Sequence, residues 1–269
     1  IIAAIGLSFT YYNTIETPKF VGLENYLNLF TNDDVFMRYV LPNTVIYAIC
    51  IGIGGYILAF ILAWALSQIT KGPRTVLALI IYSPSMTGGV MLSTVWSVIF
   101  NGSESGYLNY ILLKFNIIDQ PVVWLSSEKH LLWIMIVVTL WSSMGIGFLS
   151  MLSGILNVNE ELYEAAYIDG VKNRFQEIIY VTIPSAKPQM LFGAVMSIVN
   201  TFQSAGIGTV LSGANPTPGY SGQLIVSHIE DYGFLRYEMG YAAAVSVVLL
   251  AGIYLMTKGV NKLLSSKDE

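Results

Sequence analysis

The sequence predicts an all-α integral membrane protein with about six transmembrane helices. Three observations favour this fold class. Hydrophobic residues make up 54% of the 269 residues and charged residues only 11%, whereas soluble domains carry about 25% charged residues. Uncharged runs long enough to cross a bilayer as helices recur along the chain. Short polar segments that contain Gly and Pro separate these runs, as loops separate membrane spans.

The apolar runs can be placed in chain order. Residues 1–15 are too few for a whole span, and we expect them to be the end of a span that begins upstream. Residues 20–36 form a polar and aromatic connector, which predicts short interfacial helices. The five later spans are expected near residues 40–70, 75–100, 130–156, 189–211 and 239–257. Pro84 breaks the span at 75–100, because proline removes one backbone hydrogen bond of a helix.

Basic residues predict the orientation of these spans. Eight of the 13 Lys and Arg residues fall on the side that holds the polar segment 157–187 and the C-terminus. They are Lys71, Arg74, Lys172, Arg174, Lys187, Lys258, Lys262 and Lys267. The positive-inside rule places this side in the cytoplasm. Aromatic residues gather on the other side, as an interfacial belt would, and include Tyr107, Tyr110, Trp124, Trp133, Tyr237 and Tyr241.

The polar segment 157–187 lies between two long uncharged runs. Glu160 and Glu161 begin a stretch of good helix formers. Acidic groups near the N-terminus of a helix interact favourably with the helix dipole. Gly170 is expected to end this helix, since glycine accepts the left-handed backbone that closes helices. Apolar residues then recur at helical spacing up to Pro184. The segment therefore predicts a helix, a glycine bend and a second amphipathic helix that returns to the membrane.

This segment resembles the EAA loop of ABC importer permeases. The resemblance rests on Glu164-Ala165-Ala166, Asp169-Gly170 and Ile183-Pro184. In that family a cytoplasmic coupling helix docks in a groove on the ATPase subunit. The resemblance implies the same role for Glu164, Ala165, Ala166, Asp169 and Gly170. Small alanines permit close approach of a partner, and a glutamate can meet a basic groove. The alternative is an ordinary amphipathic loop between two spans.

The resemblance extends over essentially the whole chain. Residues 20–26, the Leu41-Pro42-Asn43-Thr44 segment and several Trp and Pro positions are similar to carbohydrate-uptake permeases of the maltose and glycerol-phosphate type, and most to the first maltose permease. The resemblance implies the type I ABC importer permease fold as a single transmembrane domain over residues 1–269. It also implies four kinds of partner in the bacterial plasma membrane: a second, related permease in a heterodimer, an ABC ATPase dimer, an external solute-binding protein and the lipid bilayer.

Motifs for other chemistry are missing from the sequence. No Gly-Lys pair occurs, so the P-loop pattern is absent, and ATP and Mg²⁺ are expected to bind to a separate ATPase subunit. We find no catalytic motif and no acid pair within a span, which disfavours an intramembrane enzyme. Cys50 is alone, and His130 and His228 lack metal-ligand spacing, so we expect interfacial histidines and no metal site. No basic patch suggests nucleic-acid binding.

Neutral polar residues at membrane depth are the candidate solute path. They are Thr139, Trp141, Ser142, Ser143, Ser197, Asn200 and Gln203. Amides and hydroxyls that face a water-filled path can bind sugar hydroxyls, while Trp141 stacks on a sugar face; the alternative is hydrogen bonding between helices. The sequence predicts a permease for a sugar or oligosaccharide. The rival functions are a permease for another solute such as glycerol phosphate, a non-transporting membrane scaffold and an intramembrane enzyme.

Overall fold

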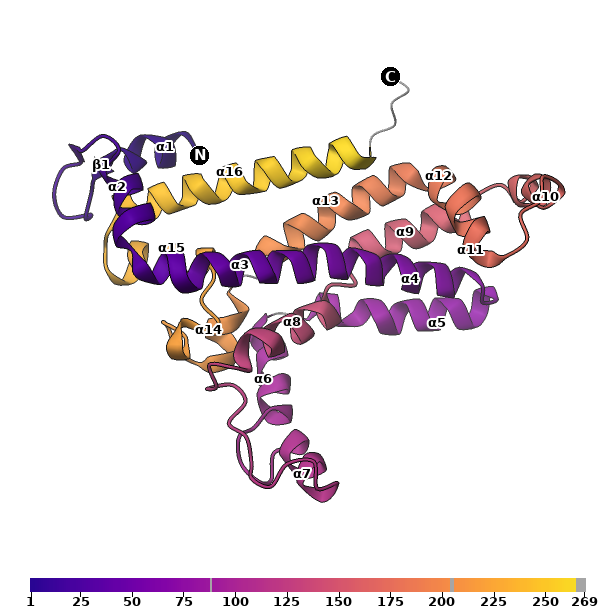
Figure 1. Ribbon diagram of the computed structural model, residues 1–269, viewed down its shortest axis with the longest axis horizontal. Coiled ribbons are helices and arrows are strands. Elements are labelled where there is room, and N and C mark those ends of the chain that lie inside the picture. The colour runs from indigo at the N-terminus through magenta and orange to yellow at the C-terminus, as the bar shows by residue number, and fades with distance from the viewer. Residues whose placement is uncertain (88, 204–205, 265–269) are drawn as a thin grey trace. The chain divides into compact units, whose positions relative to one another are not determined.

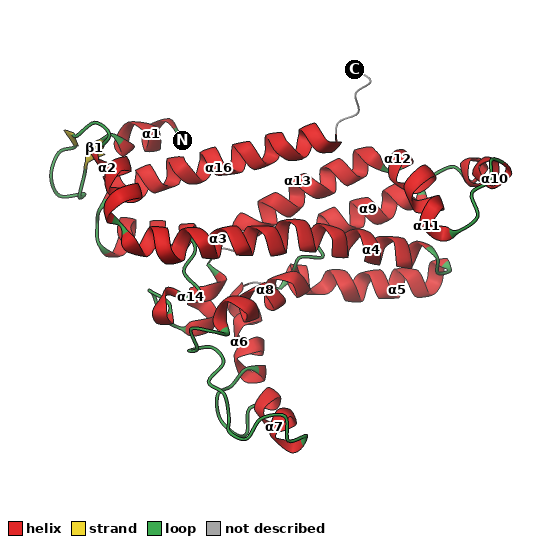
Figure 2. Ribbon diagram, viewed as in Figure 1, coloured by secondary structure: helices red, strands yellow, loops and turns green. Residues whose placement is uncertain are grey.

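The computed structural model describes residues 1–87, 89–203 and 206–264, and these residues are almost entirely helical (Figure 2). The prediction of an all-α fold is confirmed apart from one small hairpin. Strand β1 (Thr10–Tyr11) pairs antiparallel with β2 (Lys19–Phe20), with Thr10 opposite Phe20. Helix α1 (Ile2–Ser8) precedes the hairpin, and that this region is the end of a membrane span remains a prediction.

The chain divides into two compact units. The first comprises Ile1–Ile49, Gly88–Thr139 and Thr201–Met256. The second comprises Cys50–Thr87, Leu140–Asn200 and Thr257–Glu269. The single transmembrane domain expected over residues 1–269 remains a prediction.

Helices of the first unit enclose an apolar core around the start of a long helix. The elements are α1, α2 (Glu24–Leu27), α3 (Leu41–Ala48), α6 (Gly89–Ile99), α7 (Tyr107–Lys114), most of α8 (Leu131–Ser142), α14 (Ile207–Ser212), α15 (Ile225–Glu230) and most of α16 (Met239–Leu264) (Figure 1). Single π-helical turns precede and follow α3. Leu29, Phe36 and Val40 pack against Ile225 and Val245. This core fixes α15 and the first turns of α16 against the entry to α3.

The second unit packs around a helix face made of small residues. Its elements are α4 (Gly55–Ser67), α5 (Lys71–Tyr82), α9 (Ile146–Leu156), α10 (Glu160–Ile168), α11 (Arg174–Glu177), α12 (Ile183–Ser185) and most of α13 (Lys187–Gln203). Ala59 and Ala63, one turn apart on α4, lie buried in one cluster with Phe148, Met151 and other side chains of α9. Small side chains at this spacing let two helices approach closely, as membrane helices commonly do.

Four segments agree in place with the expected spans. Within the described residues, the helices Phe36–Ser67 and Met239–Gly259 are long and apolar enough to cross a membrane. Two pairs, Lys71–Met86 with Met91–Ile99 and Leu131–Ser142 with Ile146–Leu156, qualify only if each pair is one span. Helix α5 ends at Tyr82, and Pro84 lies in the 3₁₀ turn Ser83–Met86 that follows, so the α-helix stops at the predicted proline. The break between Met86 and Met91 includes residue 88, which lies outside the described residues. The span expected at residues 189–211 runs over positions 204–205, which lie outside the described residues.

The segment expected as one span at residues 130–156 is divided into two helices, a break that was not predicted. Helix α8 ends at Ser142 and α9 begins at Ile146. Two local features explain the break. The hydroxyl of Ser143 donates to the Leu140 carbonyl at 2.8 Å, in place of a helical backbone partner. Gly145 then takes an extended backbone with ψ −144°, which no helix allows.

Three Gly-Ile-Gly segments occur at residues 52–54, 145–147 and 206–208, and their glycines differ in how closely other segments approach them. A Cβ atom on Gly147 would lie 3.3 Å from the Gly193 carbonyl oxygen, so α9 and α13 touch through their backbones there. Gly208 likewise meets the Gly222 carbonyl. A Cβ atom placed on Gly54 or Gly206 would have no other atom within 4 Å. The sequence could not separate these cases, because a glycine contact depends on the partner segment as well as on the glycine.

One buried amide organises the polar loop between α6 and α8. Asn109 is fully buried on α7, and its amide nitrogen donates to the carbonyls of Asn101, Ser103 and Val122 at 3.1–3.2 Å. Its amide oxygen accepts from the Val122 N–H and from Trp124 Nε1 at 3.1 and 2.8 Å. One side chain therefore ties both ends of the loop to α7.

We expect Asn109→Leu to destabilise this loop by about 3 kcal/mol, because several buried backbone groups lose their partner at once. Hydrogen exchange of the Val122 amide in detergent measures the effect and should accelerate about a hundredfold. Tyr110→Phe, on the exposed side of the same helix, should leave that exchange rate unchanged. Unchanged exchange in Asn109→Leu would show that other contacts hold the loop.

Candidate functional site

The segment 157–187 of the second unit contains the expected helix, bend and second helix. The Asn159 side chain caps α10 by accepting from the Glu161 N–H at 3.1 Å. Gly170 follows α10 with φ +99°, a backbone that residues with side chains rarely adopt. The Asn173 side chain caps α11 in the same way through the Gln176 N–H at 2.9 Å. Two caps and one glycine thus define the path of the loop.

A buried carboxylate holds α10 and α11 together. Glu177 is 5% exposed and accepts hydrogen bonds from Tyr167 on α10 at 2.7 Å and from Arg174 at 2.8 Å. The bond to Glu177 raises the pKa of the Tyr167 phenol above its ordinary value. The hydroxyls of Tyr163 and Thr182 lie 3.2 Å apart and add a second link. The loop is therefore braced, in the sense that side-chain hydrogen bonds link its two helices.

The predicted coupling residues lie on the outside of this braced loop. Glu164, Ala165, Asp169 and Gly170 are exposed, and Ala166 is half-buried. Ala166, Asp169 and Gly170 line an open cleft together with Val171, Gln176, Tyr180 and Val181. Beside it, Ile168 is 87% exposed and Phe175 is 70% exposed.

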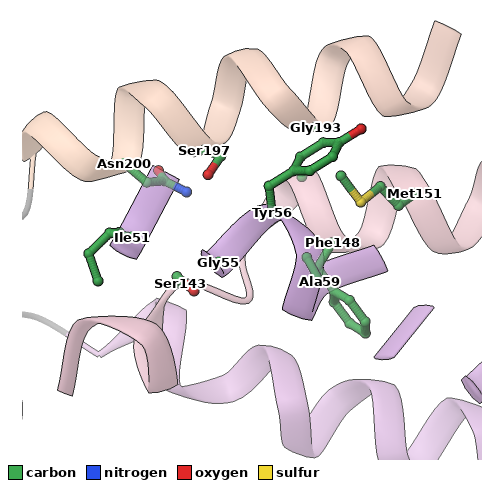
Figure 3. Close-up of a pocket in the computed structure, with 11 residues that line it drawn as sticks. Ile51, Gly55, Tyr56, Ala59, Ser143, Phe148, Met151, Gly193, Ser197 and Asn200 are labelled. Carbon is green, nitrogen blue, oxygen red and sulfur yellow. The ribbon is translucent and has the colours of Figure 1, made fainter. Parts of the chain in front are cut away.

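Three of the predicted path residues meet at one small cavity in the second unit (Figure 3). Ser143 comes from the break before α9, and Ser197 and Asn200 come from α13. Ser197 donates to the Gly52 carbonyl at 2.9 Å, which joins α13 to the chain just before α4. The Asn200 amide nitrogen would lie 3.8 Å from a Cβ atom on Gly145, so the amide sits against the break.

The other predicted path residues do not line this cavity. Thr139 is 3% exposed in the first unit, and its hydroxyl lies 2.8 Å from the Tyr47 hydroxyl. Trp141 and Ser142 end α8, and the Trp141 side chain is 47% exposed. Gln203 ends α13, but its side chain lies outside the described part of the structure. A role for these residues in a solute path remains a prediction.

Sequence analysis missed the contribution of α4 to the cavity. A Cβ atom on Gly55 would lie 3.3 Å from the Ser143 hydroxyl oxygen, so this glycine lets α4 approach the break. Tyr56 adds an aromatic ring and a hydroxyl. Both residues stand in an apolar run with no local polar pattern. A tyrosine within a long uncharged span was the one available signal.

Sequence analysis also missed a buried polar cluster in the first unit. His228 was expected at the membrane interface, but it is 2% exposed, and its Nε2 lies 3.0 Å from Asp33 Oδ2. Tyr241 donates to the same oxygen at 2.6 Å, and the Phe36 N–H donates to Oδ1 at 2.8 Å. Burial favours the neutral acid, but these hydrogen bonds outweigh it and hold the pKa of Asp33 far below its ordinary value.

The chain matches a known protein family over most of its length. The family described as "Binding-protein-dependent transport system inner membrane component" matches residues 55–267. The probable ABC transporter permease protein YesP of Bacillus subtilis is 30% identical over 259 residues, which cover 95% of this chain and 81% of that protein. The arabinooligosaccharides transport system permease protein AraP of Bacillus subtilis is 32% identical and covers 89% and 74%. The lactose transport system permease protein LacF of Rhizobium radiobacter is 28% identical and covers 89% and 79%.

A solved structure shares the fold. A bacterial ABC transporter involved in the import of the acidic polysaccharide alginate superimposes with a TM-score of 0.81 at 21% identity, over 100% of this chain and 90% of that chain. A structure of a bacterial alginate ABC transporter in complex with an alginate pentasaccharide-bound periplasmic protein gives a TM-score of 0.77. The fold is therefore that of an importer permease, and the apolar helices are those of a membrane protein. The chain belongs to the family of binding-protein-dependent transport system inner membrane components.

Proposed function

We propose that this chain is the permease subunit of an ATP-driven importer that takes up a sugar or oligosaccharide. The observation that carries the proposal is the meeting of Ser143, Ser197 and Asn200 at one cavity lined by apolar helices. Hydroxyl and amide groups suit an uncharged solute rich in hydroxyls. Relatives named for arabinooligosaccharides, lactose and starch degradation products support a carbohydrate.

Three rival functions fit these observations less well. A solute such as glycerol phosphate carries negative charge, and no side chain that lines the cavity is charged. A scaffold or an intramembrane enzyme would not require the braced loop. The family is one of transporter permeases, so the chain is not by itself an enzyme.

The segment 157–187 is the proposed docking element for a separate ATPase subunit. Glu164, Ala165, Asp169 and Gly170 stand exposed beside the apolar side chains of Ile168 and Phe175. The links between α10 and α11 let a push on one helix move the other. ATP and Mg²⁺ would bind to an ATPase dimer, whose closure would shift the helices around the cavity. A second permease and an external solute-binding protein would complete the importer.

The proposed arrangement places about six helices across the bacterial plasma membrane. The loop and the C-terminus would face the cytoplasm, where eight of the 13 basic residues would gather. The polar loop around α7 and the cluster of Asp33, His228 and Tyr241 would then lie near the outer surface. Side chains exposed on α5, such as Leu79 and Ile80, would meet lipid or the second permease.

We expect Glu164→Lys to reduce ATPase capture about tenfold, because an exposed acid that meets a basic groove becomes a repulsive charge. The tagged chain is expressed with the ATPase and companion permease of its own operon, and the ATPase retained in detergent is quantified. Glu104→Lys, a charge reversal in the loop predicted to lie outside the cell, is the matched control and should retain full capture. The proposal fails if the wild type captures no ATPase or if both variants capture it equally.

A further inference from the structure

The hydroxyl of Tyr56 has no hydrogen-bond partner among the described residues. Its oxygen is buried, and the side chain projects from α4 (Figure 3). Buried hydroxyls in native proteins almost always find a partner, since an unpaired one forfeits its hydration without compensation. An unpartnered hydroxyl inside the second unit therefore needs an explanation.

The position of Tyr56 suggests what the missing partner is. Tyr56 lines the same cavity as Ser143, Ser197 and Asn200, and its hydroxyl points past Gly193, away from those three polar side chains (Figure 3). The rest of the wall is apolar and includes Ile51, Ala59 and Phe148. An aromatic ring beside neutral hydrogen-bonding groups is the usual lining of a site for a small neutral ligand.

The hydrogen bonds at the cavity leave one group that can accept a hydrogen bond from a ligand and one that can donate to it. The hydroxyl of Ser143 donates its hydrogen to the Leu140 carbonyl, so its oxygen can still act as an acceptor. Tyr56 retains its hydroxyl hydrogen as a donor. A ligand hydroxyl both donates and accepts, and can therefore satisfy groups of both kinds.

The size of the cavity shows that a sugar does not fit in this conformation. The cavity volume is about 20 Å³, which is room for about one water molecule, whereas ligand sites measure about 300–1,000 Å³. Helices α4, α9 and α13 must separate before a sugar ring can enter. Such a separation would uncover the Tyr56 hydroxyl at the Gly193 end of the cavity and Ser143 and Asn200 at the other end.

We propose that Tyr56 is a specificity-determining residue of the solute path, whose hydroxyl hydrogen-bonds to one hydroxyl of the sugar when the path opens. This inference rests on the proposed function. It adds α4 to the two elements that the sequence selected, α13 and the break before α9. It also predicts which chemical difference between solutes the cavity can detect, namely the presence of a single hydroxyl.

The test pairs Tyr56→Phe with solutes that lack one hydroxyl. The complete importer is reconstituted, and uptake is measured for lactose, maltotriose and α-1,5-linked arabinotriose, and for the monodeoxy analogues of each. Tyr254→Phe, which removes a hydroxyl from the exposed face of α16, is the matched control. The binding protein is the same in every sample, so its own preference cancels when the variants are compared.

For each protein, discrimination is the uptake of the parent sugar divided by the uptake of its deoxy analogue. For one analogue, we expect the discrimination of the wild type and of Tyr254→Phe to be about fivefold larger than that of Tyr56→Phe, which is the factor for one neutral hydrogen bond. Equal discrimination by all three proteins would overturn the inference, even if Tyr56→Phe raised the melting temperature by removing an unpaired hydroxyl. A loss of discrimination in Tyr254→Phe as large as in Tyr56→Phe would overturn it too. If the wild type imports none of the three sugars, the proposed function fails and the inference fails with it.

Discussion

Replacement of Gly170 by valine is expected to reduce solute uptake about 10- to 100-fold while the spans still fold. Gly170 has φ +99°, where a β-branched side chain clashes with its own backbone at a cost of about 1–3 kcal/mol. A Cβ atom at this position would meet nothing within 4 Å, so the cost comes from the backbone alone. The bend between α10 and α11 would relax, and the exposed coupling residues would leave their present positions.

A graded series separates the backbone effect from the effect of added bulk. Gly170→Asn should retain more uptake than Gly170→Val, since asparagine visits positive φ several times more readily than other residues. Gly72→Val is the matched control, because Gly72 has open space and no positive φ. Uptake of a transported sugar and ATPase capture are measured for each. Equal losses at Gly72 and Gly170, or normal uptake in Gly170→Val, would contradict the role of the bend.

The sequence was informative where the chemistry is local. The glycine bend and the helices on either side of it follow from residue types within a few positions of one another, and the structure contains them. Whether this loop couples to an ATPase remains a prediction. The end of α5 just before Pro84 was also predictable, because proline cannot continue the backbone hydrogen bonding of an α-helix. The break before α9 was not predictable, because serine and glycine also occur within many unbroken membrane helices.

Only some of the residues that line the candidate cavity could be predicted from the sequence. Ser143, Ser197 and Asn200 were selected as polar residues at membrane depth, but Thr139 satisfied the same criterion and instead pairs with Tyr47 in a buried core. Polarity and depth do not tell which face of a helix a side chain occupies. Tyr56 was missed because its role depends on two other helices that reach it only in the folded chain.

The buried cluster of Asp33, His228 and Tyr241 in the first unit could not be predicted from local sequence patterns. Asp33 and His228 are separated by 195 residues in the chain, and no local pattern links them. Their contact joins the connector before α3 to α15, and Tyr241 adds α16 to the same carboxylate. One acidic side chain thus joins three segments of the first unit, namely the connector before α3, α15 and α16.

We therefore expect Asp33→Ala to destabilise the first unit by about 3 kcal/mol, because it leaves His228 and Tyr241 buried without their shared acceptor. Asp34→Ala is the matched control, since the Asp34 side chain is 81% exposed and its ion pair with Arg38 contributes little. The melting temperature of the detergent-solubilised chain measures both variants. Equal melting temperatures for Asp33→Ala and the wild type would refute the anchoring role of this carboxylate.

The stabilisation that Asp33 contributes should also depend on pH. The pKa of Asp33 is lower in the folded chain than in the unfolded chain, so its contribution is present above the unfolded value of about 4 and is lost as the pH falls toward the folded value. The melting-temperature difference between the wild type and Asp33→Ala should be constant near neutral pH and should shrink below about pH 4. A difference that persists unchanged in acid would mean that the carboxylate supports the fold by its shape alone, because a protonated acid fills the same space without the charge that His228, Tyr241 and the Phe36 N–H stabilise.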